Sequence, residues 1–365
     1  KARDIADSTK TLDVDGGTIK LDGNYPTGLN NVALGNGALD AALTGGSNTG
    51  LGSNSLSANT SGAQNTAIGN ASLLLNQTGT ANTAVGDDAL IINVSGSYNV
   101  AVGADSLYNT TASNNTAVGQ GSGRYNTTGT ENVMVGVAAL EDNTTGNYNA
   151  ALGSEALTNN TTGSFNTAVG RQSLYVNTTA NSNTGIGYKA LFANTTGFSN
   201  TTVGTNSLDA NTTGSNNVAM GQSALATSTT GIRNTALGAN SLVSNTTASS
   251  NTAVGYEAGY TANQGANVFI GQWAGYGNST GESNTCVGYG SGSNIGVGSG
   301  SNNTYIGRGA GAQVTTGSKN VIIGAYAGVG SGLDIRTSSN NIVLSDGDGN
   351  PRMYYTNATV NWRIA

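Results

Sequence analysis

Hydrophobic and polar positions follow one short pattern along almost the whole chain. Each copy reads N-T-A-V-G, two variable residues, Ala or Ser followed by Leu, and then N-T-T-G, with local substitutions. The glycine that follows the aliphatic residue returns every 17 residues, with two intervals of 16 and one of 19. A fixed short period indicates a solenoid, in which one supersecondary unit stacks on copies of itself. The repeating glycines are Gly35, Gly52, Gly69, Gly86, Gly103, Gly119, Gly136, Gly153, Gly170, Gly187, Gly204, Gly221, Gly238, Gly255, Gly271, Gly288, Gly307 and Gly324.

The repeat is too short for the helical hairpins of longer repeat families, and it suits one coil of β-structure. We expect two short strands in each coil, the first at N-T-A-V and the second around Ala/Ser-Leu. The glycine between them permits a bend that a Cβ would hinder, and N-T-T-G supplies the other turn. The sequence therefore predicts an all-β fold, a β-solenoid or β-roll of about 18 coils of 17 residues.

Both faces of the first strand are apolar in the sequence. Branched side chains precede each repeating glycine, and small ones, such as Ala67, Ala84 and Ala101, stand one position earlier. Neighbouring residues of a strand point to opposite faces. Because so thin a coil has one interior, we expect the alanine face to pack against other copies of the chain in a parallel homotrimer.

An asparagine stands four residues before every repeating glycine. Stacked inward amides can bond their own turn and the coils above and below, so we interpret this row as a structural ladder. Recognition of sugars by the row is the alternative. The asparagine of N-T-T-G, for example Asn177, is expected to lie exposed in a turn; it also matches the glycosylation sequon, which turn chemistry explains more simply. Representative members of the ladder are Asn65, Asn82, Asn99, Asn166 and Asn234.

Composition changes along the chain and divides it into four parts. We expect residues 1–30 to form a β cap or connector with a hairpin at 11–21, and residues 31–255 to form the regular rod. In residues 256–340 the Ala/Ser-Leu pair becomes Ala/Ser-Gly, which is expected to let backbones approach closely. Insertions at 293–301 and 329–338 in that part are expected to protrude as loops. Residues 341–365 are expected to form a C-terminal β cap.

The residue types present favour a structural role over catalysis. The chain has no His and one Cys, so Ser-His-Asp, Cys-His and histidine metal sites are excluded. We expect no enzyme and no cofactor. Cys286 occupies the buried alanine position. A net charge of −6 and the absence of Lys and Arg between Lys20 and Arg124 disfavour nucleic acid. No apolar run is long enough for a membrane helix, so membrane insertion is not expected.

One short segment near the C-terminus has metal-binding features. Asp346, Asp348 and Asn350 alternate like the start of a calcium loop, but the later Glu is missing and Pro351 follows. A hairpin turn is the preferred interpretation, and we expect no metal.

Aromatic residues gather after Tyr256, where the period also slips. Core filling is the preferred interpretation of these aromatics, and a sugar-stacking surface is the alternative. Aromatics and irregular loops on a rigid scaffold are, however, typical of recognition sites. We therefore place receptor binding in the C-terminal third. The candidate receptor-binding residues are Trp273, Tyr276, Tyr289, Ser293, Asn294 and Tyr305.

The repeated N-T-A-V-G-x-x-A-L resembles the N-S-x-A-I-G-x-x-S-x-A repeats in the heads of trimeric autotransporter adhesins, which are trimeric β-rolls with a shorter repeat. The segment N-I-V-L-S-D-G-D-G-N at 341–350 resembles bacteriophage tail fibres, in which similar text precedes an intramolecular chaperone domain. This resemblance implies a chaperone that is cleaved after trimerisation or lies beyond Ala365. It also implies a virion fibre that contacts the host surface.

The leading hypothesis is the shaft and distal part of a trimeric phage tail fibre, located in the virion and extracellular. Its expected partners are its own copies, other virion tail proteins, and a glycan or protein receptor on the host. A bacterial trimeric adhesin passenger on the cell surface is the first alternative. A fibre-borne polysaccharide depolymerase is the second, and a regular Thr face that binds ice is a remote third.

Overall fold

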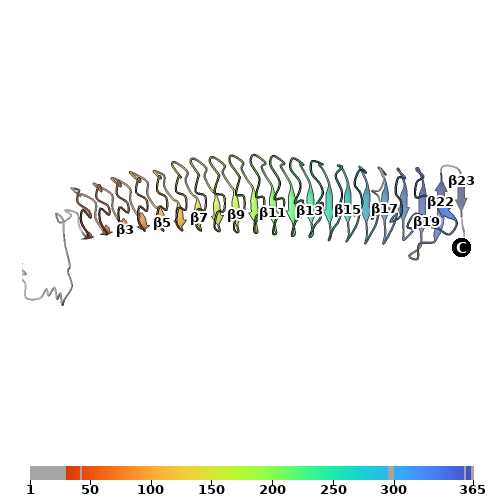
Figure 1. Ribbon diagram of the computed structural model, residues 1–365, viewed down its shortest axis with the longest axis horizontal. Coiled ribbons are helices and arrows are strands. Elements are labelled where there is room, and N and C mark those ends of the chain that lie inside the picture. The colour runs from red at the N-terminus through yellow and green to blue at the C-terminus, as the bar shows by residue number, and fades with distance from the viewer. Residues whose placement is uncertain (1–29, 42, 295–299, 357–358, 363–365) are drawn as a thin grey trace, which may run out of the picture.

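The computed structural model is an elongated solenoid whose coils succeed one another along a single axis (Figure 1). It describes residues 30–41, 43–294, 300–356 and 359–362. Eighteen coils each contribute one strand, β1 to β18, to a continuous parallel sheet. The described residues contain no helix. The predicted all-β solenoid of about 18 coils is thus confirmed, while the hairpin expected at 11–21 and the rest of the N-terminal cap up to residue 29 lie outside the described residues.

The strands are short and evenly spaced. They are β1 (Val32–Leu34), β2 (Thr49–Leu51), β3 (Thr66–Ile68), β4 (Thr83–Val85), β5 (Val100–Val102), β6 (Thr116–Val118), β7 (Val133–Val135), β8 (Ala150–Leu152), β9 (Thr167–Val169), β10 (Thr184–Ile186), β11 (Thr201–Val203), β12 (Val218–Met220), β13 (Thr235–Leu237), β14 (Thr252–Val254), β15 (Val268–Ile270), β16 (Thr285–Val287), β17 (Thr304–Ile306), β18 (Val321–Ile323), β19 (Val329–Gly330), β20 (Leu333–Asp334), β21 (Ile342–Ser345), β22 (Pro351–Thr356) and β23 (Thr359–Trp362).

Equivalent residues of successive coils stand directly opposite each other. Ala67 pairs with Ala84, and Ala84 pairs with Ala101, so the sheet keeps one register along the rod. The intervals of 16 and 19 residues leave this pairing unchanged, because Val100 still pairs with Thr116 and Thr285 with Thr304. The irregular spacing is therefore absorbed in the turns, outside the sheet.

The second strand expected around Ala/Ser-Leu does not form. This segment is a turn in which alternate residues have left-handed backbone angles, such as Ala71 at φ 50° and Leu73 at φ 51°. Its N–H groups still bond neighbouring coils, from Ala71 to the Ser53 carbonyl and from Leu73 to the Ala89 carbonyl, both at 2.9 Å. Left-handed angles are costly for side chains that are not Gly, and they persist where the surrounding structure fixes them. Stacking on identical coils provides that constraint here.

The interior of each coil is lined by the central strand residue and the leucine opposite it. Ala67, Ala84 and Ala101 are fully buried within their own chain, as are Leu73 and Leu90. The expectation that the alanine face meets another copy was therefore wrong. The aliphatic residues before the repeating glycines point outward instead.

These outward residues form a row along the sheet that we call the aliphatic stripe. A typical member, Ile186, is 39% exposed. Its members are Leu34, Leu51, Ile68, Val85, Val102, Val118, Val135, Leu152, Val169, Ile186, Val203, Met220, Leu237, Val254, Ile270, Val287, Ile306 and Ile323.

The asparagine before each strand forms the expected buried ladder. The Asn166 backbone N–H donates to Asn149 Oδ1 at 3.0 Å, and its Nδ2 donates to the Ala180 carbonyl at 2.8 Å. Asn166 Oδ1 in turn accepts the Asn183 N–H at 3.0 Å. Asn166 thus joins three coils, which satisfies polar groups that burial would otherwise leave unpaired.

The N-T-T-G asparagines form a second buried ladder, which contradicts their expected exposure. Asn177 is completely buried, and its Nδ2 donates to Asn160 Oδ1 at 2.9 Å and to the Ala180 carbonyl at 3.1 Å. The same burial applies to Asn126, Asn143, Asn160, Asn194, Asn211 and Asn245. A buried amide cannot reach a glycosylating enzyme in the folded chain, which supports turn chemistry as the reason for these sequons.

Replacing Asn166 or Asn177 with Ala is expected to lower the free energy of unfolding by similar amounts. Each change leaves the Ala180 carbonyl with one donor fewer and breaks a link of its ladder. The expected loss is roughly 1–3 kcal/mol for each variant. Urea unfolding followed by circular dichroism measures it.

The control for this comparison is Asn181→Ser. Asn181 is exposed, and its Oδ1 accepts the Ser164 N–H at 2.7 Å. Ser97 holds the equivalent position in another coil, and its hydroxyl accepts the Thr80 N–H at 3.0 Å, so serine should suffice. A much smaller loss for Asn177→Ala than for Asn166→Ala would contradict a second structural ladder.

In the C-terminal third, the glycine of Ala/Ser-Gly makes room for a large core side chain. A Cβ on Gly275 would lie 2.2 Å from the Phe269 ring, and one on Gly311 would lie 2.6 Å from the Tyr305 ring. Phe269 and Tyr305 occupy the central strand position where most coils have Ala. The expected closer approach of backbones is therefore not the explanation. A large residue on one wall is offset by the loss of leucine from the other.

The rod ends in the expected strand-rich cap. β21 adds a last parallel strand beside β18, and β22 and β23 follow as antiparallel neighbours. The insertion at 329–338 contains the short antiparallel pair β19 and β20, anchored by the buried Ile335 and by Tyr326, whose hydroxyl donates to the Leu333 carbonyl at 2.6 Å. Of the other expected loop, residues 295–299 lie outside the described part of the chain.

Candidate functional site

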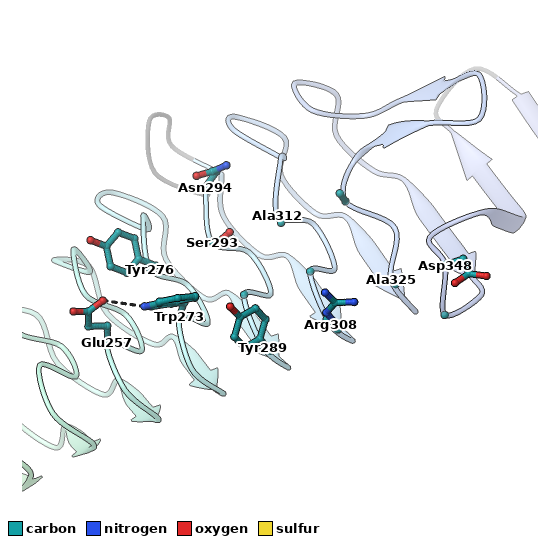
Figure 2. Close-up of a pocket in the computed structure, with 14 residues that line it drawn as sticks. Glu257, Trp273, Tyr276, Tyr289, Ser293, Asn294, Arg308, Ala312, Ala325 and Asp348 are labelled. Carbon is teal, nitrogen blue, oxygen red and sulfur yellow. Dashed lines mark hydrogen bonds between the residues drawn. The ribbon is translucent and has the colours of Figure 1, made fainter.

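An open groove crosses the coil corners that follow β14 to β18 and ends at the turn between β21 and β22 (Figure 2). It has a volume of about 820 Å³. Its long direction runs from coil to coil, so its two ends are built by residues far apart in the sequence. The lining residues are Glu257, Trp273, Tyr276, Tyr289, Gly290, Ser293, Asn294, Arg308, Gly309, Ala312, Ala325, Ala327, Gly347 and Asp348.

The floor is formed where two coils lack a side chain. Gly290 and Gly309 stand two residues after their repeating glycines, with φ 62° and 64°. The same turn position carries Asn206 at φ 54° and Asn240 at φ 56° in the regular rod. A Cβ built on Gly290 or Gly309 would have no atom within 4 Å apart from its immediate chain neighbours. The hollow therefore arises from glycines in two successive coils, at a corner that bears a side chain in most other coils.

One end of the groove is aromatic. Trp273 donates its indole N–H to Glu257 Oε2 at 2.9 Å, which fixes the ring on the corner (Figure 2). The Tyr289 ring meets Trp273 edge-on, with ring centroids 5.4 Å apart. Tyr276 stacks on Tyr260 with centroids 5.0 Å apart. Neighbouring aromatic rings thus hold Tyr276 and Tyr289 in place. Both side chains remain exposed, so their rings still reach solvent.

The other end carries opposite charges. Arg308 is exposed, and none of the hydrogen bonds or ion pairs found among the described residues involves its guanidinium. Asp348 is exposed in the turn between β21 and β22. Both side chains lie along the groove, beyond Tyr289 (Figure 2).

The turn at residues 346–350, between β21 and β22, is a hairpin turn. Asp346 accepts the backbone N–H groups of Asn350 at 2.9 Å and Asp348 at 3.0 Å, and Arg352 Nη2 lies 2.6 Å from Asp346 Oδ2. These donors, led by the Asn350 N–H, lower the pKa of Asp346 to about 2. The Asp346 carboxylate is thus occupied by donors from its own turn, which supports the hairpin interpretation over a calcium loop. The part of the chain that the structure describes holds no cluster of three or more His, Cys, Asp or Glu suited to a metal ion.

Five of the six candidate receptor-binding residues meet in the groove: Trp273, Tyr276, Tyr289, Ser293 and Asn294. Tyr305 does not, because it is fully buried at the centre of β17. Burial also raises the pKa of its phenol.

Sequence reasoning missed Glu257, Arg308 and the glycine floor. A signal existed for the floor: Gly290 and Gly309 are consecutive departures from the side chains usual at that repeat position. For Arg308 no such signal existed, because charged residues occupy variable positions throughout the rod.

The lone cysteine lies apart from this groove. Cys286 is fully buried in β16, as expected from its place in the repeat, and burial raises the pKa of its thiol. A thiol kept protonated and shielded from solvent is a poor nucleophile.

Comparison with known proteins finds no matching family model, no similar curated protein and no similar solved structure. Among the described residues, no helix has the length and apolar character needed to cross a membrane.

Proposed function

We propose that this protein is a structural and adhesive fibre, the shaft and distal region of a homotrimeric phage tail fibre that attaches the virion to the host cell surface. The observation that carries the proposal is the combination of a long uniform rod with one aromatic groove near its C-terminal end. Eighteen coils at about 4.8 Å each give a rod of roughly 85 Å. Such a shape suits a spacer that presents a binding surface at a distance.

The aliphatic stripe is the surface that supports self-association. It follows the whole sheet, with members such as Leu152 and Leu237 at 40% and 44% exposure. Exposed apolar patches of this extent on soluble proteins mark interaction sites. If identical rods packed in parallel, the stripe residues of equivalent coils would meet around a common axis. The stripe thus replaces the alanine face as the proposed trimer contact.

The groove gives little support to the depolymerase alternative. Glycosidases hold two carboxyl groups about 5–9.5 Å apart. Glu257 follows β14 and Asp348 follows β21, which are five strands apart in the sheet, or roughly 24 Å at the usual strand spacing. Glu257 is also engaged by the Trp273 indole. A groove that binds and releases a ligand unchanged fits this arrangement better.

Binding to cells with defined surfaces tests the proposal. The fluorescently labelled protein would be incubated with a panel of bacterial strains, each paired with a derivative that lacks its surface polysaccharide. We expect a trimer mass by light scattering and retention on at least one strain. A monomer mass for folded protein, or no retention on any strain, would contradict it. Release of reducing ends from the polysaccharide would favour the depolymerase, and a membrane anchor encoded downstream of Ala365 would favour the bacterial adhesin.

A further inference from the structure

We propose that the groove binds an extended oligosaccharide that carries carboxylate groups, with sugar rings against Trp273 and Tyr289 and a carboxylate on Arg308. This inference rests on the proposed adhesive function and specifies the ligand class of its site. It follows from three features of the groove: its shape, its aromatic end and its cation.

The shape favours a linear ligand. The groove spans the corners of five successive coils and the following turn, so it runs parallel to the solenoid axis (Figure 2). Its floor at Gly290 and Gly309 is backbone alone, which lets a ligand approach the chain closely. Five strand spacings amount to roughly 24 Å. A trough of this length and openness fits a chain of several sugar units better than one compact molecule.

The aromatic end offers apolar ring faces with polar groups beside them. Trp273 is partly buried and locked by Glu257, so binding costs little side-chain entropy there. Tyr289 is 48% exposed next to it. Aromatic side chains combine an apolar body with a polar edge. Sugars have the complementary surface, C–H faces flanked by hydroxyl groups, which Ser293 and Asn294 can hydrogen-bond.

Arg308 selects for a carboxylate. Its guanidinium is the cation of the groove lining, and neither Glu257 nor Asp348 lies within ion-pair distance of it. A guanidinium presents paired N–H donors that match a carboxylate in a bidentate manner. The two acidic residues stand toward the ends of the groove, where they can accept bonds from sugar hydroxyls. A phosphate-rich ligand such as nucleic acid would meet these carboxylates without further cations to offset them.

Three variants of the full chain separate these contributions. Gly309→Asn places a side chain on the floor, at a left-handed position where Asn206 and Asn240 already occur. Its matched control is Gly121→Asn, at the same repeat position with φ 64° but in the regular rod, far from the groove. Arg308→Gln removes the cation. Trp273→Ala removes the ring at a position that Ala71 and Ala138 occupy in other coils.

The probes are oligosaccharides of galacturonate, mannuronate and hyaluronan, with chitohexaose as the uncharged comparison. Binding is followed by tryptophan fluorescence for the unmodified chain and the Gly and Arg variants, and by calorimetry for all of them. We expect at least one acidic probe to bind at least tenfold more tightly than chitohexaose. Gly309→Asn, Arg308→Gln and Trp273→Ala should each weaken that binding at least tenfold, and Gly121→Asn should leave it unchanged.

Several results would overturn the inference. These are binding of no acidic probe, equal affinity for chitohexaose, or full affinity in the folded Gly309→Asn variant. Retention on cells that survives all three groove variants would leave the adhesive function standing and move its site elsewhere. If the unmodified protein were retained on none of the strains, the result would instead count against the proposed function itself.

Discussion

Replacing Ala101 with Asp is expected to unfold the coils around β5 and divide the rod. Ala101 is fully buried between Ala84 and Ala117 of the neighbouring strands. An Asp there adds volume to a thin core and places a carboxylate among buried apolar side chains. An unpaired buried charge costs on the order of 3–5 kcal/mol. Because a solenoid is stabilised by contacts between neighbouring coils, the defect separates the coils before and after it.

The matched substitution is Val102→Asp, one residue along the same strand. Val102 belongs to the aliphatic stripe and is partly exposed, so the coil should fold with Asp at this position. Circular dichroism and thermal unfolding report the fold, and light scattering reports the mass. We expect Ala101→Asp to lose the cooperative transition, and Val102→Asp to keep it while weakening the proposed trimer. A stable, cooperatively unfolding rod in the Ala101→Asp variant would contradict the assignment of the interior.

Replacing Gly187 with Ala is expected to destabilise the corner of its coil strongly. Gly187 has φ +133°, which side-chain-bearing residues rarely adopt. A Cβ there would lie 2.6 Å from the Gly204 carbonyl oxygen, and that oxygen belongs to rigid backbone. Backbone strain and overpacking each cost about 1–3 kcal/mol, so the sum is on the order of 2–6 kcal/mol.

The control for this change is Gly121→Ala. Gly121 has φ 64°, and a Cβ there meets only Glu141 Oε1, at 3.8 Å. Ala71 and Ala138 show that alanine is tolerated at this repeat position. Urea unfolding should therefore show a loss for Gly187→Ala several times larger than for Gly121→Ala. Similar losses of stability for the two variants would mean that the position of the repeating glycines does not require glycine.

The sequence by itself determined that the chain is a β-solenoid, where its coils begin, and that the pre-strand asparagines stack inward. These features repeat with the same period, and a period of 17 residues leaves few ways to stack the copies. It also placed Trp273, Tyr276 and Tyr289 in one region, because aromatic residues concentrate in the C-terminal coils, where the period slips.

Only the tertiary structure decided which face of each strand is inside. Alternation along N-T-A-V defines two faces, and both are apolar, so the pattern cannot choose between them. The width of the coil makes the choice: a leucine such as Leu90 reaches across it, so the buried strand residue opposite is small in most coils. Where the strand carries Phe269 or Tyr305, the leucine is replaced by Gly275 or Gly311. Tyr305 is therefore a core residue, although its place in the aromatic-rich C-terminal third suggested a binding residue.

The turns depended on the tertiary structure for a related reason. Leu73 and Asn177 adopt their observed environments because neighbouring coils fix the backbone and supply partners for their amide groups. Local sequence preference favours a strand for the first and an exposed turn for the second. The groove likewise exists only after coiling, since Gly290, Arg308 and Asp348 become neighbours along one face when the chain stacks. Periodicity specifies how the coils stack. The packing of unlike side chains between coils decides which residues are buried and which are exposed.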